Sequence, residues 1–477
     1  MITFVTCLVV LVASYFIYGR LLDRVAGVDP TADVPSKSCY DGVDYMPLPR
    51  WRIFLVQLLN IAGTGPIFGA ILGACYGPVA FLWITLGGIF MGAMHDYFSG
   101  VISLRNNGCS LTEIIGKYLG RGMHRFALVM IPILMVLVGG VFIVTPAKVL
   151  TSMTHMPYLV WVGIIIIYYF IATILPIDKI IGKVYPLFGA AFIIMALSMF
   201  GLLLFGDYSI PELTSFDNMH FNAESLPIIP TLFISIACGA ISGFHATQSP
   251  LMARCMTNEK QSRPVFFGAM ISESIIALIW AAIAMAFWGG IEGLNDFMVK
   301  NSSDAGLAVS TISVTALGVV GSILTLIGVV AAPITSGDTA FRSARLIVAD
   351  MLGIEQRSVV KRLLVSLPLF ALGIGIAFID FDVIWRYFAW SNQALSVITL
   401  WMITAWLSRK HSNYVMLSLI PAMFMTYVCS AFVFVSNQFV GMGACNEAYV
   451  YAAALTAIIA GLMMLKIRKD VKSGLGV

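Results

Sequence analysis

Two apolar segments of the chain are interrupted by glycines and polar residues. The first reads Asn60-Ile-Ala-Gly-Thr-Gly-Pro66, and the second reads Cys238-Gly-Ala-Ile-Ser-Gly-Phe-His-Ala-Thr-Gln248. An unpaired backbone polar group inside a bilayer costs several kcal/mol, so an interrupted helix persists there only beside protein or water. Two interruptions that meet near the bilayer centre can use their freed backbone groups to bind a substrate and an ion. The pair therefore predicts a transport site.

The first interruption combines flexible backbone with polar side chains. Gly63 and Gly65 permit backbone torsions that other residues avoid, and the following proline favours the first turn of a new helix. The bare N–H groups and positive dipole at that helix start suit a carboxylate. Asn60 and Thr64 add side-chain donors. The alternative is close helix packing, since small residues at this spacing are common between membrane helices.

The second interruption is dense in polar residues. Ser242, Gly243, His245 and Gln248 lie within seven positions of one predicted span. Such groups are unfavourable against lipid, so we expect them to face the protein interior. His245 could carry a proton, because the reference pKa of histidine is about 6.5. It could equally be a neutral histidine that only forms hydrogen bonds.

A single acidic residue lies deep in the next predicted span. Glu273 is about nine residues into the range 264–290, roughly 13 Å deep at 1.5 Å per residue. An intramembrane carboxylate of this kind is a candidate proton relay or cation ligand. The alternative is a structural glutamate bonded to Ser272, Ser274 or a neighbouring helix.

Oxygen-bearing side chains gather at the end of a later span. Thr335, Ser336 and Asp338 follow a proline that frees backbone carbonyls. Oxygen ligands suit a hard cation, so Thr335 and Ser336 are candidates for a Na⁺ site. The alternative is a helix end at which Asp338 caps an amphipathic helix over Thr339–Leu352, lying in the membrane interface with its two arginines on the polar side.

Three further residues are candidates for gating. His95 and Asp96 lie near the inner end of a predicted span, where they could form a gate or a proton path, or simply an interfacial pair. Arg386 lies at the outer end of another span. It could steer an anionic substrate or close an outer gate, or its long side chain could reach the lipid headgroups.

The composition is that of a polytopic membrane protein. Of 477 residues, 59% are hydrophobic and only 11% are charged, whereas about a quarter are charged in soluble domains. The apolar runs are continuous and about 20 residues long, as spanning helices require. The first run, Ile2–Gly19, lacks a basic start and a small-residue cleavage site, so we expect a retained helix instead of a signal peptide.

Thirteen spans are predicted, a leading helix followed by helices 1 to 12. Of the 28 Lys and Arg residues, 25 fall in alternate loops, whereas the opposite loops hold only Lys148 and Lys300. The positive-inside rule then predicts a cytoplasmic C-terminus and an external N-terminus. The spans are expected at 2–19, 54–76, 78–104, 124–147, 158–176, 184–205, 227–250, 264–290, 308–335, 361–379, 383–407, 413–436 and 446–466.

The spans divide into two halves of five. An odd number per half inverts the second half relative to the first, and the interruptions fall in the equivalent helices 1 and 6. This arrangement predicts an all-α, leucine-transporter-like 5+5 inverted-repeat fold. Its parts are a leading helix and cytoplasmic loop, two repeats and two peripheral helices with a cytoplasmic tail, at 1–53, 54–206, 207–410 and 411–477.

Other classes of site find little support. The eight cysteines include no CxxC pair, so the sequence suggests neither a disulfide framework nor a metal cage. The formal charge of +4 follows from topology and does not indicate nucleic acid. An intramembrane enzyme is a weaker hypothesis, because HExxH, GxSxG and phosphate-binding loop motifs are missing from the sequence. We therefore expect no cofactor beyond a possible Na⁺, and membrane lipid as the surroundings.

The chain resembles the carbon starvation protein A family of bacterial inner-membrane transporters. The similarity extends from about residue 20 to 410. It is carried by Asp41-Gly-Val-Asp-Tyr-Met-Pro47, Ile61-Ala-Gly-Thr-Gly-Pro66, Gly92-Ala-Met-His-Asp96, Ser242-Gly-Phe-His-Ala-Thr-Gln-Ser-Pro250, Gly268-Ala-Met-Ile-Ser-Glu273, Ile279-Trp280, Thr335-Ser-Gly-Asp-Thr-Ala-Phe-Arg342 and Trp390-Ser-Asn-Gln393.

The resemblance implies uptake of peptides or of small carboxylates such as pyruvate, linked to carbon starvation and driven by H⁺ or Na⁺. Many members carry a histidine pair before the glycine break, where this chain has Val56 and Gln57, which makes Na⁺ coupling more plausible. Many members are also longer, so a short form without additional C-terminal spans is expected. A channel or nutrient sensor of the same fold is the alternative. The sequence leaves the substrate and the oligomeric state open.

Overall fold

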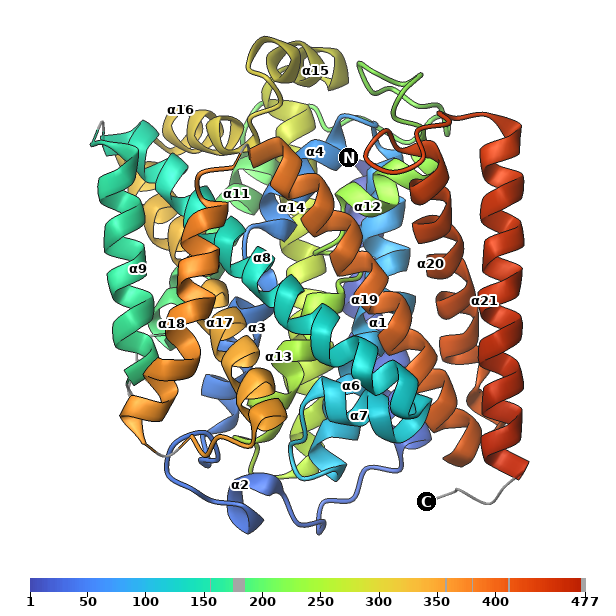
Figure 1. The fold of residues 1–477 in the computed structure, drawn as a ribbon. Coiled ribbons are helices and arrows are strands. Elements are labelled where there is room, and N and C mark those ends of the chain that lie inside the picture. The colour runs from blue at the N-terminus through green and yellow to red at the C-terminus, as the bar shows by residue number, and fades with distance from the viewer. Residues whose placement is uncertain (155, 175–184, 357, 380, 411, 473–477) are drawn as a thin grey trace.

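The computed structural model describes residues 1–154, 156–174, 185–356, 358–379, 381–410 and 412–472, and within these ranges the chain is a bundle of helices (Figure 1). The predicted loop 177–183 lies outside the described residues. The first half contains α1 Ile2–Ala26, α2 Pro35–Ser38, α3 Arg50–Ala62, α4 Ala70–Ala74, α5 Val79–Leu82, α6 Met94–Arg105, α7 Leu111–Leu119, α8 Arg121–Thr154, α9 Tyr158–Ile174 and α11 Tyr185–Phe205.

The second half contains α12 Phe233–Ser235, α13 Gly243–Ala253, α14 Gly268–Phe287, α15 Ile291–Lys300, α16 Ala305–Thr325, α17 Ala331–Leu352, α18 Val359–Ile376, α19 Phe381–Lys410, α20 Met416–Val435 and α21 Asn446–Lys472. Short π-helical segments join several of these helices, at Gly65–Gly69, Trp83–Ala93, Ile228–Leu232, Arg263–Phe267 and Leu326–Val330. Single turns of 3-10 helix lie at Glu259–Gln261 and Ser412–Tyr414.

Eight helical segments among the described residues are long and apolar enough to cross a membrane. The bent pair Arg50–Ala62 and Gly65–Ala74 would be a ninth, and Tyr158–Thr173 and Ala305–Val319 are shorter apolar helices. Each of the thirteen predicted ranges contains helix, but several are interrupted. The all-helical membrane fold is therefore confirmed, and the number of crossings stays a prediction.

The outside of the bundle is apolar, as contact with lipid requires. On α21, which lies at one edge in Figure 1, Val450, Leu462 and Leu465 are each more than 60% exposed. A water-soluble protein rarely presents so continuous an apolar surface. Polar side chains are concentrated in the interior instead, along α3, α6, α13, α14 and α17.

The prediction of an interfacial helix over Thr339–Leu352 is wrong. These residues continue α17, which runs unbroken from Ala331 and packs against the long helix α8. Arg342 and Arg345 are 4% and 1% exposed, so they do not face water or headgroups. The physical reason is Asp44, a buried residue of the segment between α2 and α3, which lies within ion-pair distance of both arginines.

Asp44 balances a cluster of buried arginines. Its Oδ1 lies 3.4 Å from Arg342 Nη1, and its Oδ2 lies 3.9 Å from Arg345 Nη2. Burial alone would raise the pKa of Asp44, but Arg345, Arg342, Arg254 and Arg362 together hold the pKa below its ordinary value. The carboxylate therefore stays charged at neutral pH. Its contribution to stability is lost only as the pH falls through that lowered pKa.

We expect Asp44→Asn to destabilise the protein by about 3–5 kcal/mol, because removal of one partner leaves buried charge uncompensated. Thermal unfolding of the purified protein in detergent measures this effect. Asp33→Asn is the matched control, since Asp33 is an exposed aspartate of the loop between α1 and α2. Equal unfolding midpoints for the two variants would contradict the proposed balance.

Candidate functional site

The first interruption bends the chain sharply. α3 ends at Ala62, and the segment Gly65–Ala74 leaves at 55° to it. Gly63 has φ +48°, and a Cβ there would lie 2.5 Å from the Phe142 ring. Both the torsion and the lack of space require glycine at this position. The polar candidates Asn60 and Thr64 flank the bend, and both are buried.

The second interruption is longer. α12 ends at Ser235 and α13 begins at Gly243, with Gly239 between them at φ +92°. Side chains from other helices bind the carbonyls that the interruption frees. Trp83 Nε1 donates to Ile236 O at 3.0 Å, and Gln393 Nε2 donates to Phe233 O at 3.1 Å. Protein groups thus supply what water would supply outside a membrane.

Asn392 of α19 holds the start of α13. Its Oδ1 accepts a hydrogen bond from the Phe244 backbone N–H at 2.7 Å, and its Nδ2 donates to Ser242 Oγ at 2.9 Å. The sequence places Asn392 and Gln393 in the motif Trp390-Ser-Asn-Gln393, but it predicts no role for them. The signal that could have found them was a pair of adjacent amides inside an apolar span, which need polar partners within the protein.

The two interruptions touch each other. A Cβ added at Gly65 would overlap Cys238 Cβ, and one at Gly69 would lie 2.9 Å from the Ser235 carbonyl oxygen. Only glycine, which has no side-chain carbon, permits the two segments to lie this close. The candidates of the first stretch, Gly63, Thr64 and Gly65, therefore lie beside the segment that leads into Ser242 and Gly243.

A fully buried cluster of ionisable side chains lies close to Cys238. His95 Nδ1 is 2.8 Å from Asp96 Oδ1, and His245 Nδ1 is 2.9 Å from Asp96 Oδ2. The other ring nitrogen of this imidazole, His245 Nε2, is 3.6 Å from Glu273 Oε2. All four side chains are 0% exposed. The chain thus brings together residues from α6, α13 and α14 that sequence reasoning treated separately.

This cluster corrects two of the alternatives considered above. His95 and Asp96 are not an interfacial pair, because they lie in the interior against α13. Glu273 does not rest on its neighbouring serines: Ser272 donates to the Gly268 carbonyl and Ser274 to the Met270 carbonyl. Neither carboxylate oxygen of Glu273 accepts a hydrogen bond from the described residues.

Other buried polar groups around the interruptions also lack protein partners. Within the described part of the chain, no hydrogen bond satisfies the side-chain amides of Gln57 and Asn60, the Thr64 hydroxyl, Gln248 Oε1 or the Trp280 indole N–H. Native structures leave few such groups unpaired. Their concentration on α3, α13 and α14 indicates a site for a polar ligand or water.

The predicted Na⁺ ligands occupy a separate place on α17. Ser336 Oγ donates to the Leu59 carbonyl of α3 at 2.7 Å, and Thr335 Oγ1 donates to the Ala332 carbonyl at 2.8 Å. Asp338 does not cap a helix; it lies within α17 and accepts a hydrogen bond from Tyr185 OH at 2.6 Å. Ser336 thus lies at the contact between α17 and α3, just before the first interruption, whereas Asp338 contacts α11.

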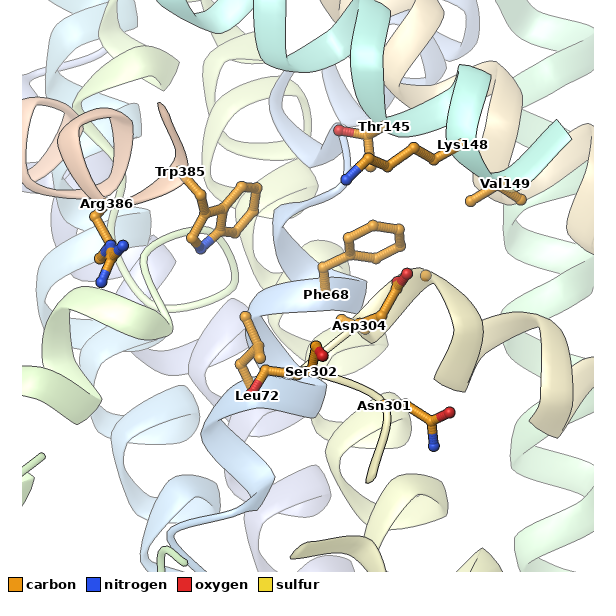
Figure 2. A pocket seen from close by; sticks show the side chains of 13 residues that line it. Phe68, Leu72, Thr145, Lys148, Val149, Asn301, Ser302, Asp304, Trp385 and Arg386 are labelled. Atoms are coloured by element: carbon orange, nitrogen blue, oxygen red, sulfur yellow. The ribbon is translucent and has the colours of Figure 1, made fainter. Parts of the chain in front are cut away.

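A cavity of about 390 Å³ adjoins the first interruption (Figure 2). Phe68, which follows the bend, lines it together with Lys148 of α8 and Trp385 and Arg386 of α19. The cavity thus gathers two of the few basic residues outside the cytoplasmic loops predicted from the sequence. Arg386 lines this cavity and is not part of the buried cluster, and its gating role stays a prediction.

Comparison with known sequences identifies the family. The profile of the family described as carbon starvation protein CstA matches residues 1–160 and 143–320. The chain belongs to this family. An uncharacterized membrane protein of Haemophilus influenzae is 41% identical over 347 residues, which cover 62% of this chain and 94% of that protein.

Two relatives in Escherichia coli have functional names. The pyruvate/proton symporter BtsT is 25% identical, with 63% of this chain and 50% of that protein covered. The peptide transporter CstA is 26% identical, with 56% and 47% covered. The chain thus spans about half the length of each. These family members identify it as a multi-pass inner-membrane transporter and not an enzyme.

Solved structures agree on the fold. Mhp1, a nucleobase-cation-symport-1 family transporter, is 12% identical at a TM-score of 0.54, with 89% of this chain and 93% of that chain covered. A manganese transporter of Eremococcus coleocola is 13% identical at a TM-score of 0.52, with 91% and 99% covered. The CstA-family chain therefore has the fold of known transporters.

The contact between the interruptions predicts a specific pair of substitutions. Gly65→Ala should destabilise the protein by about 1–3 kcal/mol, because the new methyl group overlaps Cys238. The second substitution Cys238→Gly removes the overlapped atoms and should restore part of the loss. Thermal unfolding in detergent measures both. Gly201→Ala, where a methyl group meets open space, is the control; destabilisation of the same size there would contradict the contact.

Proposed function

We propose that the protein is a secondary active transporter, a symporter that imports a small carboxylate such as pyruvate or a short peptide. The observation that carries this proposal is the meeting of two helix interruptions beside unpartnered buried polar groups. Two E. coli relatives named as a pyruvate/proton symporter and a peptide transporter support the substrate class. Both kinds of substrate carry a carboxylate.

The substrate site lies between α3 and α13. The helix starts after Gly65 and at Gly243 present positive dipole ends to the substrate carboxylate, while the backbone N–H groups of Ile67, Phe68 and Phe244 are already bonded within the protein. The side chains of Asn60, Thr64 and Gln248 also line the site. Each has at least one polar atom that makes no hydrogen bond with the described residues. A bound substrate would satisfy these groups, which explains why they can be buried.

The cluster of His245, Asp96 and Glu273 carries the coupling cation. Two carboxylates that face one imidazole favour a positive charge between them. His245 of the cluster and Gln248 of the substrate site lie on the same helix, so the occupancy of the cluster and that of the site are coupled through α13. Thr335, Ser336 and Asp338 are the second candidate, a Na⁺ site on α17 that would act through α3.

The cavity beside the first interruption is the entrance. Lys148 and Arg386 outnumber Asp304 among the charged residues of its lining, so its walls attract an anionic substrate, and Trp385 and Phe68 offer apolar surface for its body. The orientation that places this cavity outside follows from the distribution of Lys and Arg in the sequence. Helices 1–5 and 6–10 would form the inverted repeats of an alternating-access mechanism in the bacterial inner membrane.

We expect Lys148→Gln to raise the KM for an anionic substrate about 10-fold at low ionic strength, with a smaller effect at high salt. Initial uptake rates at two salt concentrations measure this. Lys300→Gln is the matched control, because Lys300 is an exposed lysine on α15 that does not line the cavity. An identical change in both variants would mean that the cavity does not collect the substrate.

Uptake into proteoliposomes tests the function itself. Labelled pyruvate and labelled dipeptides are compared under separate H⁺ and Na⁺ gradients. A symporter accumulates substrate above equilibrium, a channel or sensor does not, and an enzyme alters it chemically. Chemically intact substrate that never exceeds equilibrium under either gradient would contradict the proposal.

Glu273→Gln keeps the shape of the side chain but removes its charge. We expect it to abolish gradient-driven accumulation while the protein remains folded by size-exclusion chromatography. Glu292→Gln, at an exposed position at the start of α15, should accumulate substrate normally. Unchanged ion dependence in Glu273→Gln would show that Glu273 has only a structural role.

A further inference from the structure

We propose that Cys238, His245 and Glu273 form a binding site for a divalent transition-metal ion, with Zn²⁺ as the best fit. One ligand atom of each residue lies within 4.8 Å of the other two, and all three side chains are buried. The site shares His245 and Glu273 with the proposed coupling cluster, but metal binding can be tested whatever the protein transports.

The three residues come from three elements that lie together in the fold. Cys238 lies in the interruption before α13, His245 lies in the first turn of α13, and Glu273 lies on α14. The cysteine is a free thiol, fixed in place by its contact with Gly65. Sequence reasoning missed this set because no two of the ligands have the short spacing of a metal-binding motif.

The hydrogen bond to Asp96 orients the histidine for metal binding. A carboxylate only accepts hydrogen bonds, so at 2.9 Å from Asp96 Oδ2 the Nδ1 atom of His245 carries the proton. When a metal ion displaces the proton that His245 Nε2 otherwise holds against Glu273, the Nε2 lone pair points towards Glu273 and can bind the ion. A carboxylate behind a histidine in this way is the usual support of a metal-ligating imidazole.

The second ring nitrogen of His245 and the carboxylate of Glu273 are buried acceptors without hydrogen-bond donors in the part of the chain that the structure describes. His245 Nε2 and both Glu273 oxygens make no hydrogen bond with the described residues, although all are buried. The 3.6 Å between Nε2 and Oε2 agrees with the separation of about 3.3–3.8 Å between two ligands of one tetrahedral ion. An ion between these atoms would neutralise the carboxylate and satisfy the lone pairs.

The ligand types select the ion. A thiolate, an imidazole and a carboxylate together suit Zn²⁺, whereas Na⁺, Mg²⁺ and Ca²⁺ prefer oxygen alone. Three protein ligands leave the fourth tetrahedral position open. Cys238, one of the three ligands, also contacts Gly65 of the first interruption. A water molecule or a carboxylate oxygen from the cavity side could complete the coordination.

Metal titration of the tag-free, full-length protein in detergent tests the inference after treatment with a chelator. Co²⁺ is the spectroscopic probe, since thiolate ligation produces a charge-transfer band in the near ultraviolet. We expect one equivalent of Co²⁺ to generate the band and Zn²⁺ to displace it. Cys238→Ala should lose the band. Cys75→Ala, which removes another buried membrane thiol, should keep it.

Two more variants keep the test decisive if Cys238→Ala does not fold. Glu273→Gln should weaken Zn²⁺ binding at least 10-fold, and Asp96→Asn should weaken it about 10–100-fold through the orientation of His245. Failure of the wild-type protein to bind one equivalent, or a band that survives in Cys238→Ala, would overturn the site. Unchanged affinity in Glu273→Gln would overturn it as well.

Discussion

The close contact between two interrupted helices is the constraint on which the rest of the structure depends. Gly65 and Gly69 allow the first interruption to lie directly against Cys238 and Ser235 of the second. Each interruption frees backbone groups that cannot remain unpaired inside a bilayer. The fold meets this requirement with side chains from distant helices, among them Trp83, which bonds the Ile236 carbonyl.

Buried charge follows the same rule of local compensation. In the interior, Asp96 lies between His95 and His245, and Glu273 faces the second ring nitrogen of His245. Towards the α2–α3 segment, Asp44 is buried against several arginines. Charges are costly in a membrane protein unless they face the interior and have partners. The positions of these groups are therefore set by one another, which couples α6, α13, α14 and α17.

The sequence predicts these features to different extents. Composition and apolar run length predict a helical membrane protein, because each span must satisfy its own backbone. Glycines 63 and 65 indicate where the chain leaves the first helix, because no other residue adopts the required torsions or fits the space. The glycine between α12 and α13 does the same for the second. These features can be predicted from the sequence because each depends on residues that are close together in the chain.

Contacts between segments that are distant in the sequence cannot be predicted in this way. Nothing around Arg342 and Arg345 shows that Asp44, some 300 positions earlier, buries them, so α17 looked like a surface helix beyond Thr339. The same holds for the support that Asn392 gives to α13 and for the approach of Cys238 to His245 and Glu273. The roles of the candidate residues in transport stay predictions.

The most direct measurement is a cryo-electron microscopy structure of the protein in lipid nanodiscs with pyruvate or a dipeptide bound. We predict substrate density between the bend after α3 and the start of α13, within hydrogen-bonding distance of the side chains of Asn60, Thr64 or Gln248. Density elsewhere, or two straight helices where the interruptions lie, would contradict it.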